Sequence, residues 1–184
     1  MYNTIFKSDD PAVVVESLNG YRIREEVPTN LSEFNVPLGL PEILREGTDV
    51  TIVTYGSCVR IAEKTCDKLA EVGISCELID AQTLLPFDRF GAITESLKKT
   101  NKLVLMDEDV PSGATAFMLQ QITEKQGGLQ YLDCVPKTIT ATENRTPFGS
   151  DGDFFCKPNE EDLFEGVYEL MNEYNPNKYP IYYR

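Results

Sequence analysis

Apolar positions after residue 49 change their period in a regular way. Residues 50–55, VTIVTY, form a continuous β-branched run that predicts a buried strand. Residues 58–71 repeat apolar side chains at helical spacing, and Gly73 ends this predicted helix. Residues 76–81, CELIDA, predict the next strand. Strand, helix and strand in this order form a βαβ unit, which requires a parallel sheet.

The same alternation continues toward the C-terminus. We expect helices over 87–100, after the PSGA turn at 111–114 and around Leu163 to Met171, with strands over 103–108 and 136–143. Right-handed crossovers place helices on both faces of such a sheet. The predicted fold class is therefore α/β, a three-layer α/β/α arrangement with a mostly parallel, roughly five-stranded sheet.

The first 47 residues have a different texture. Residues 12–17, AVVVES, and 21–25, YRIRE, predict two strands around a turn. A stretch rich in proline and without a sustained period follows, as is typical of a connector. Two strands alone cannot form a core. We therefore expect residues 1–47 to be the end of a neighbouring domain plus a linker, and residues 48–184 to be the α/β domain.

Composition excludes several classes of partner. The chain has 184 residues and a net charge of −13, which disfavours nucleic acid and anionic membranes because both bind through Lys and Arg. Its N-terminus lacks the basic start and apolar core of a secretory signal, and no apolar run could span a bilayer. Five cysteines without CxxC spacing fit a reducing compartment. A cytoplasmic location is expected.

Two C-terminal features suggest interaction surfaces. Between Asp151 and Glu173 eight acidic residues stand against one Lys157. This stretch is either a solvated helix face, the commoner case, or a docking surface for a basic partner. The tail combines tyrosines with prolines, which favours a strap over another subunit or domain. Its tyrosines are Tyr174, Tyr179, Tyr182 and Tyr183.

The chain contains no histidine, so Ser-His-Asp and Cys-His catalysis are excluded. Cys58 stands at a helix start, where a thiol can be activated, but without a histidine base a buried structural thiol is favoured. The predicted strand ends are acidic and lack Lys or Arg, which disfavours a small-anion site. Asp107, Glu108 and Asp109 could bind Mg²⁺ or Ca²⁺, yet consecutive side chains diverge, so no metal site is predicted.

Other polar positions have a structural and a functional interpretation. Gly113 indicates close backbone approach at a helix entry. Asp80, Thr83 and Asp88 bracket LLPF, and a helix cap by Asp88 is favoured over a loop that presents a carboxylate. Arg145 could clamp a carboxylate or pair with Glu143, and the sequence does not separate these two.

Four ordered motifs resemble a known family. DVTIVTYGS, IDAQTLLPFD, LVLMDED with a following SG, and TATENRTPF are similar to the C-terminal domain of transketolase-like enzymes. They most resemble the beta subunit, or beta-like half, of thiamine diphosphate-dependent 2-oxo acid dehydrogenases. IFKSDDPAVVVESLNGYR resembles the end of that family's pyrimidine-binding domain. On this resemblance, residues 1–47 are the end of the pyrimidine-binding domain plus a linker.

The resemblance implies that the cofactor-activating glutamate and the substrate-facing histidines lie outside this chain. No catalytic, cofactor-binding or metal-binding residue is therefore assigned. Thiamine diphosphate and magnesium are implied for the whole enzyme, not for this part alone. Asp107-Glu108 stands where the family usually has His-Glu, and Glu108 and Gly113 match its pattern. Expected interface residues are Asp107, Glu108, Gly113, Glu160, Glu161, Asp162, Tyr182 and Tyr183.

The leading hypothesis is an assembly and docking domain of a pyruvate-type or branched-chain 2-oxo acid dehydrogenase. Its expected partners are the alpha and pyrimidine-domain halves of the same enzyme, in a homo-oligomer or heterotetramer, and the basic subunit-binding module of the acyltransferase core. The alternative is a free-standing α/β module that binds a small ligand at the strand ends. A sugar-phosphate synthase of the transketolase type is disfavoured by the lack of a basic rim.

Overall fold

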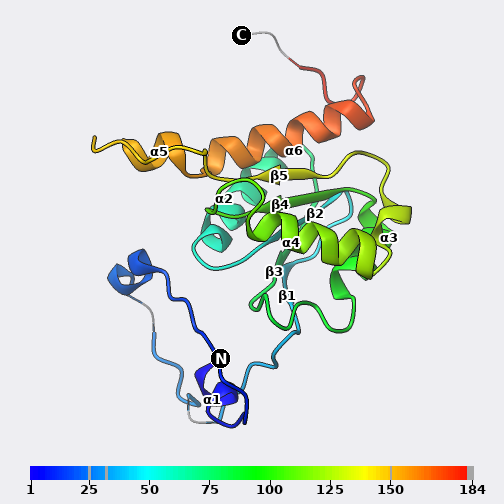
Figure 1. Ribbon diagram of the computed structural model, residues 1–184. Coiled ribbons are helices and arrows are strands. Elements are labelled where there is room, and N and C mark those ends of the chain that lie inside the picture. Colours follow the sequence, from blue (N-terminus) through cyan, green and yellow to red (C-terminus); the bar gives the residue numbers. More distant parts are fainter. Residues whose placement is uncertain (25, 32, 150, 182–184) are drawn as a thin grey trace.

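A five-stranded sheet forms the centre of the protein (Figure 1). The structure, a computed structural model, describes residues 1–24, 26–31, 33–149 and 151–181. The strand order is β1-β3-β2-β4-β5. Only β1 is antiparallel to its neighbour, and the other pairs are parallel, which confirms the predicted sheet. The strands are β1 (Glu42–Arg45), β2 (Val50–Thr54), β3 (Cys76–Asp80), β4 (Leu103–Met106) and β5 (Lys137–Ile139).

Helices cover both faces of the sheet and make three layers (Figure 1). On one face lie α2 (Cys58–Glu71) and α6 (Glu160–Tyr174), and on the other lie α3 (Ala92–Thr100) and α4 (Ala114–Gln120). A π-helical turn, η2 (Gln121–Lys125), continues α4. Side chains of one strand alternate between the two cores, since Ile52 packs with α2 and Val53 with α3. The three-layer prediction is therefore confirmed.

Several predicted boundaries are wrong by a few residues. The helix predicted over 87–100 begins only at Ala92, because residues 87–91 form a loop that leads into its first turn. The strand predicted over 103–108 ends at Met106, and that predicted over 136–143 covers only Lys137–Ile139. The two strands are paired with each other and end at the same register, with Met106 opposite Ile139. Beyond this pair they are joined by isolated backbone hydrogen bonds such as Ala141 N–H to the Asp109 carbonyl at 2.9 Å.

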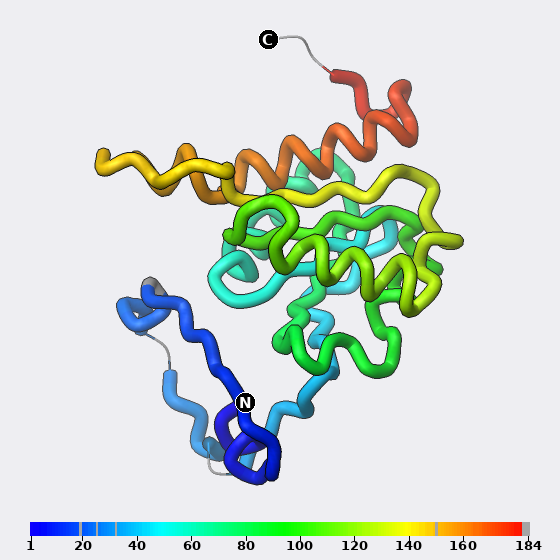
Figure 2. The backbone as a smooth tube through the Cα atoms, in the orientation of Figure 1, coloured from blue at the N-terminus to red at the C-terminus, as the bar shows by residue number. Residues whose placement is uncertain are grey.

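The two strands predicted over 12–17 and 21–25 are absent, and that prediction is wrong. Residues 12–17 are extended without a pairing partner, and residues 18–22 form a 3₁₀ turn, η1 (Leu18–Arg22). Residue 25 lies outside the described residues. Figure 2 shows that this N-terminal segment lies apart from the three-layer domain. Extended backbone needs a neighbouring strand to satisfy its N–H and C=O groups in a sheet, and no described residue forms a strand beside this segment.

We call residues 1–36 the N-terminal arm. Its short helix α1 (Tyr2–Ile5) is tied to residues 31–36 by side-chain hydrogen bonds, including Asn3 Nδ2 to the Phe34 carbonyl at 2.9 Å and Thr4 Oγ1 to the Val36 carbonyl at 2.6 Å. Among its described residues none is buried. The arm is therefore a closed loop without a core.

Within the predicted connector, β1 is a strand that the sequence did not indicate. It pairs with β3 from Glu42 opposite Asp80, with a register shift between Ile43 and Arg45. The sheet thus begins before residue 48. The linker is also held at its start, because Gly39 N–H donates to Thr83 Oγ1 at 2.9 Å and Arg89 N–H donates to the Gly39 carbonyl at 2.8 Å.

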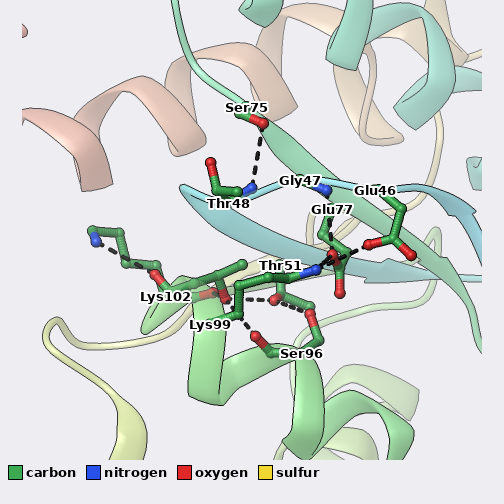
Figure 3. A network of polar contacts seen from close by, with 10 residues as sticks. Glu46, Gly47, Thr48, Thr51, Ser75, Glu77, Ser96, Lys99 and Lys102 are labelled. Carbon is green, nitrogen blue, oxygen red and sulfur yellow. Dashed lines mark hydrogen bonds and ion pairs between the residues drawn. The ribbon is translucent and has the colours of Figure 1, made fainter.

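A buried polar network fixes the point where the linker enters the sheet (Figure 3). Glu77 on β3 has a side chain that is 1% exposed, and its Oε2 accepts from Gly47 N–H at 3.2 Å and pairs with Lys99. Lys99 also reaches Glu46 at 3.0 Å. Burial opposes ionisation of Glu77, but hydrogen bonds from Lys99, Ser96 and Gly47 outweigh it and lower its pKa.

A second part of this network joins β2 to α3. Thr51 Oγ1 lies 2.6 Å from both Ser96 Oγ and Thr100 Oγ1, and all three side chains are buried. These hydroxyls satisfy one another inside an otherwise apolar contact. No helix within the described part of the chain is both long and apolar enough to cross a membrane.

Candidate functional site

The carboxyl ends of β2 and β4 meet at one edge of the sheet, where open α/β folds usually bind ligands. Tyr55, directly after β2, donates its hydroxyl to Asp107 Oδ2 at 2.7 Å. Burial raises the pKa of Asp107, and the hydrogen bond from Tyr55 opposes that rise. Burial and Asp107 together raise the pKa of the Tyr55 phenol. The Asp107 side chain is thus buried behind the rim, where it accepts the hydrogen bond from Tyr55.

Glu108 is the outward member of the same pair. Its Oε1 accepts from Ser57 Oγ at 2.5 Å, and its Oε2 lies 3.5 Å from Lys157 Nζ. Ser57 precedes α2 and Lys157 follows α5 (Gly152–Cys156), so Glu108 joins three elements. In the sequence Lys157 is noted only as the single cation of an acidic stretch. Its distance along the chain from Glu108 gave no indication that the two side chains meet.

Gly113 lies at the entry to α4 in close contact with Asp109. A Cβ added at Gly113 would stand 2.1 Å from Asp109 Oδ2, so no larger residue fits without displacement. The predicted close approach is confirmed, and its partner is a side chain of the acidic triplet. Asp109 Oδ1 also accepts from Val110 N–H at 2.8 Å. Asp109 therefore stabilises the turn into α4.

A cavity of about 440 Å³ opens beside Glu108. The start of α2 forms its floor with Gly56, Ser57 and Cys58, and η1 of the arm faces it with Gly20. Cys58 is buried, and burial followed by the charges of Glu108 and Asp107 raises its pKa to about 11. The thiol is therefore protonated at neutral pH, in agreement with the structural role that we favoured.

The acidic start of α6 is partly committed to its own fold. Glu160 pairs with Lys68 at 2.7 Å and Lys64 at 3.3 Å on α2, and these lysines lower its pKa. Asp162 and Asn159 form a capping box, since Asp162 Oδ2 accepts from Asn159 N–H at 2.9 Å. Glu161 is exposed, and among these contacts its side chain takes part neither in the ion pairs with α2 nor in the capping box.

An aromatic and acidic surface lies where α5 meets α6. We call it the α5–α6 patch and define it by Phe154, Phe155, Glu161 and Asp162. The Phe155 side chain is 69% exposed, and its ring packs edge-on against Phe154. A second cavity of about 220 Å³ is lined by all four residues, and Phe154 also lines the larger cavity beside Glu108. The fold thus brings Glu108 and the start of α6 to one surface.

The described part of the tail packs on its own domain. Tyr179 is buried against Tyr168 of α6, and Asn172 Nδ2 donates to the Tyr179 carbonyl at 2.7 Å. Tyr174 lies under the Lys102 ammonium, 3.6 Å from its ring centroid. The predicted interface residues Tyr182 and Tyr183 lie outside the described residues.

The loop after β3 holds a helix cap. Asp88 accepts from Ala92 N–H at 2.8 Å and from Ile93 N–H at 3.0 Å, which confirms the favoured interpretation. Thr83 is committed as well, since its hydroxyl donates to the Pro86 carbonyl at 2.7 Å. Arg145, left open between two roles, lies over the Phe148 ring at 4.9 Å.

These contacts limit the chemistry of the rim. In the described ranges no group of three acidic, cysteine or histidine side chains could hold a metal ion. The carboxylates of Asp107, Glu108 and Asp109 diverge, and each has a partner in the fold.

Comparison with known families identifies the region around this rim. Residues 39–152 match the family model described as transketolase, C-terminal domain. The match begins three residues before β1 and includes all five strands.

Curated relatives cover nearly the whole chain. The beta subunit of acetoin:2,6-dichlorophenolindophenol oxidoreductase from Bacillus subtilis is 32% identical, over 91% of this chain and 48% of its own length. Pyruvate dehydrogenase E1 component subunit beta-1, mitochondrial, from Arabidopsis thaliana is 35% identical, over 85% of this chain and 43% of its own. The chain spans about half the length of the curated relatives it matches.

A solved structure supports the same fold. It is titled a split gene transketolase, inactive beta4 tetramer, and it superposes with a TM-score of 0.61 at 22% identity. The superposition covers 81% of this chain and 47% of that one. At this identity the likeness establishes the architecture alone.

Proposed function

Because the chain belongs to the transketolase C-terminal domain family, we propose that it is the assembly and docking part of a thiamine diphosphate-dependent 2-oxo acid dehydrogenase. The observation that carries this proposal is the alignment of 85 to 89% of the chain with pyruvate dehydrogenase E1 beta subunits, at 32 to 35% identity. The whole enzyme would decarboxylate a 2-oxo acid and pass the acyl group to a lipoyl carrier.

The rim residues do not fit a magnesium-bound diphosphate. Asp107 is held by Tyr55, and Glu108 is held by Ser57 and Lys157, so their oxygens are already engaged. We therefore place the cofactor in other parts of the enzyme and assign no catalytic step to this chain. Its role is to hold those parts in position.

The first assembly surface is the N-terminal arm. In this proposal residues 1–47 are the end of the pyrimidine-binding domain and its linker, the last part of which adds β1 to the sheet, and residues 48–184 are the rest of the C-terminal domain. Support comes from apolar side chains of the arm that remain 57 to 91% exposed in this chain and would be buried against the rest of that domain. They include Phe6, Val13, Val15, Leu18, Tyr21, Val27, Leu31 and Phe34.

The second surface is the α5–α6 patch. Its exposed aromatic pair is flanked by carboxylates, an arrangement suited to a basic module with an apolar centre. We propose that this patch binds the subunit-binding module of the acyltransferase core. Glu161 is the best single probe because Glu160 and Asp162 also support the fold.

The test is a binding titration between the full chain and that basic module. Glu161→Lys should weaken binding by about tenfold at low salt, since it replaces an attraction with a repulsion. Glu124→Lys, a charge reversal at an exposed residue of η2 on the opposite face, should leave binding unchanged. Equal effects of the two reversals would contradict a docking role for the patch.

A separate assay tests the absence of catalysis. Decarboxylation of pyruvate or branched-chain 2-oxo acids should require addition of the alpha and pyrimidine-domain halves. Turnover by the chain alone, with thiamine diphosphate and magnesium, would refute the proposed division of labour.

The cavity beside Glu108 favours a second candidate, a free-standing module that binds a small ligand. Its volume of about 440 Å³ is within the usual range for ligand sites. A thermal-shift screen distinguishes the two functions. Strong stabilisation by one metabolite, without association with the other halves, would favour the binding module.

A further inference from the structure

The sheet has an open edge at β1. In the strand order β1 stands at one end and pairs only with β3. Among the described residues no strand lies on its outer side. The edge of a sheet presents unpaired backbone N–H and C=O groups, to which a further strand can add. The sequence of β1, EILR, contains neither lysine nor proline, the residues that commonly block such addition.

Apolar side chains are exposed along this edge. The linker and the loop after β3 lie side by side here, because Gly39 N–H donates to Thr83 Oγ1 at 2.9 Å and Arg89 N–H donates to the Gly39 carbonyl at 2.8 Å (Figure 2). We call five exposed apolar residues of β1 and these two segments the β1 margin. With exposed fractions between 38 and 83%, they are Leu40, Ile43, Leu44, Leu85 and Phe90. Apolar side chains that gather at one exposed place are typical of a protein interface.

The charges of β1 indicate which partner fits this edge. Glu42 begins the strand and Arg45 ends it. When two β1 strands pair antiparallel, the Glu42 end of each lies at the Arg45 end of the other, so opposite charges meet at both ends. A strand with charges of one sign would be repelled at one of the two ends. A second copy of this chain therefore matches the edge better than a uniformly basic or acidic partner.

Both charged groups can take part in such contacts. The Glu42 carboxylate accepts from Gln82 Nε2 at 2.7 Å, and Arg45 binds Asp67 through Nη1 at 2.6 Å. Both contacts lie on the exposed surface. A carboxylate has two acceptor oxygens and a guanidinium has five N–H donors, so each group can bind a second partner without losing the first.

We propose that the β1 margin is a dimerisation surface, at which two copies of the chain pair their β1 strands antiparallel across a two-fold axis. The two sheets then continue into one, and the apolar side chains of the two margins cover each other. The strand has four residues and a register shift between Ile43 and Arg45, so few residue pairs form. We therefore expect a weak dimer, with a Kd of about 10 to 100 µM. The margin includes no residue of the arm or of the α5–α6 patch, so this dimer does not depend on the docking role proposed above.

The first test is sedimentation velocity of the full chain between about 5 and 500 µM, a range that brackets the expected Kd. The weight-average mass should rise from the 20.7 kDa of one chain toward twice that value. Over the same range, amide hydrogen exchange of residues 42–45 should slow by about threefold or more, because their outer backbone groups become paired. A chain that stays monomeric at the highest concentration overturns the proposal.

Charge reversals locate the surface. Glu42→Arg and Arg45→Glu should each weaken the dimer by about tenfold, because each brings like charges together at both ends. The double variant E42R/R45E restores the opposite charges and should associate within about threefold of wild type. Glu124→Arg, which makes the same change of net charge on η2, should leave association unchanged.

Arg45→Glu also removes the ion pair with Asp67, so circular dichroism checks the fold of each variant. If that variant does not fold, Glu42→Arg and the hydrogen exchange of the wild type decide the question. A dimer that Glu42→Arg weakens no more than Glu124→Arg, or a folded double variant that stays as weak as the single reversals, contradicts pairing through β1.

Discussion

Two segments of this chain that are rich in β-branched residues differ in their burial. Residues 50–54 are completely buried as β2, with Val50 0% exposed, whereas Val13 in the stretch 12–17 is 91% exposed. β2 lies between β3 and β4 and is covered by helices on both faces. Among the described residues, no strand lies beside residues 12–17 and no helix buries them, although Tyr2 of α1 donates a hydrogen bond to Glu16. The composition of a segment thus indicates whether it can form a buried strand. Whether it does so depends on the strands and helices that lie next to it.

The comparison separates a domain that completes itself from an arm that does not. Every strand of the sheet finds its partners within residues 42–139. The arm keeps its shape through polar contacts such as Asn3 with the carbonyls of residues 31 and 34. Hydrogen bonds of this exposed kind stabilise weakly because water competes for them. Stability should therefore be concentrated in the domain.

The largest expected effect is a cavity in the domain core. Leu78 is fully buried in β3, so Leu78→Ala should lower the free energy of unfolding by about 3 kcal/mol. The matched change in the arm, Val13→Ala, should cost no more than about 0.5 kcal/mol. Urea denaturation followed by circular dichroism measures both. Similar losses would mean that the arm is packed in solution.

A smaller effect is expected at the polar network that anchors the linker. Lys99→Met leaves the Glu77 carboxylate buried without its cation and should cost about 2 kcal/mol at pH 7. The adjacent surface pair gives the control, because Lys98→Met removes an exposed contact with Glu95 and a cation–π contact with Tyr131, and it should cost about 0.5 kcal/mol.

The same network predicts a pH dependence. The folded pKa of Glu77 is lowered from 4.5, so its contribution is present above pH 4.5 and is lost as the pH falls through the folded value. The stability gap between wild type and Lys99→Met should therefore narrow below pH 4.5. Unfolding titrations between pH 7 and pH 3.5 test this, and a constant gap would show that Lys99 does not stabilise the Glu77 carboxylate.

Loss of the helix cap at Asp88 should have a still smaller effect. Asp88→Ala removes the acceptor of the Ala92 and Ile93 N–H groups and should cost about 1 kcal/mol. Asp88→Asn keeps one oxygen of the same size and position, so it should cost less than the alanine change. Chemical denaturation measures both variants, and equal costs would argue that the carboxylate does not cap α3.

The sequence predicted the domain better than its edges. β2, β3 and α2 were located within a residue or two because burial on both faces and a helical repeat leave clear patterns. β1 was missed because Glu42–Arg45 is a short edge strand in a proline-rich stretch, with exposed polar ends. Its pairing is set by β3, whose paired residues lie 33 to 38 positions away (from Arg45 opposite Leu78 to Glu42 opposite Asp80), which no local pattern contains.

The candidate site was predictable in part for the same reason. Asp107 and Glu108 were found because they follow a buried strand, and the cap at Asp88 follows from its position before a helix. The contact of Glu108 with Lys157 was not predictable, since it joins the loop after β4 to the residue after α5 across the fold. The ion pair of Glu160 and the capping box of Asp162 were also not predictable. An acidic stretch has the same composition whether or not its carboxylates form such contacts.

The smallest expected effect is the most informative about the two regions. Deletion of residues 1–36 removes the arm but keeps Gly39, whose backbone binds the loop at Thr83 and Arg89. It should change the Tm of the domain by less than about 2 °C, because no described residue of the arm is buried. Deletion through residue 46 also removes β1 and the Glu46 contact of Lys99, and it should lower the Tm by about 5 °C or more. Scanning calorimetry of the two truncations compares them directly. If the shorter deletion costs as much as the longer one, the arm contributes to the domain in solution, and the division at the linker is wrong.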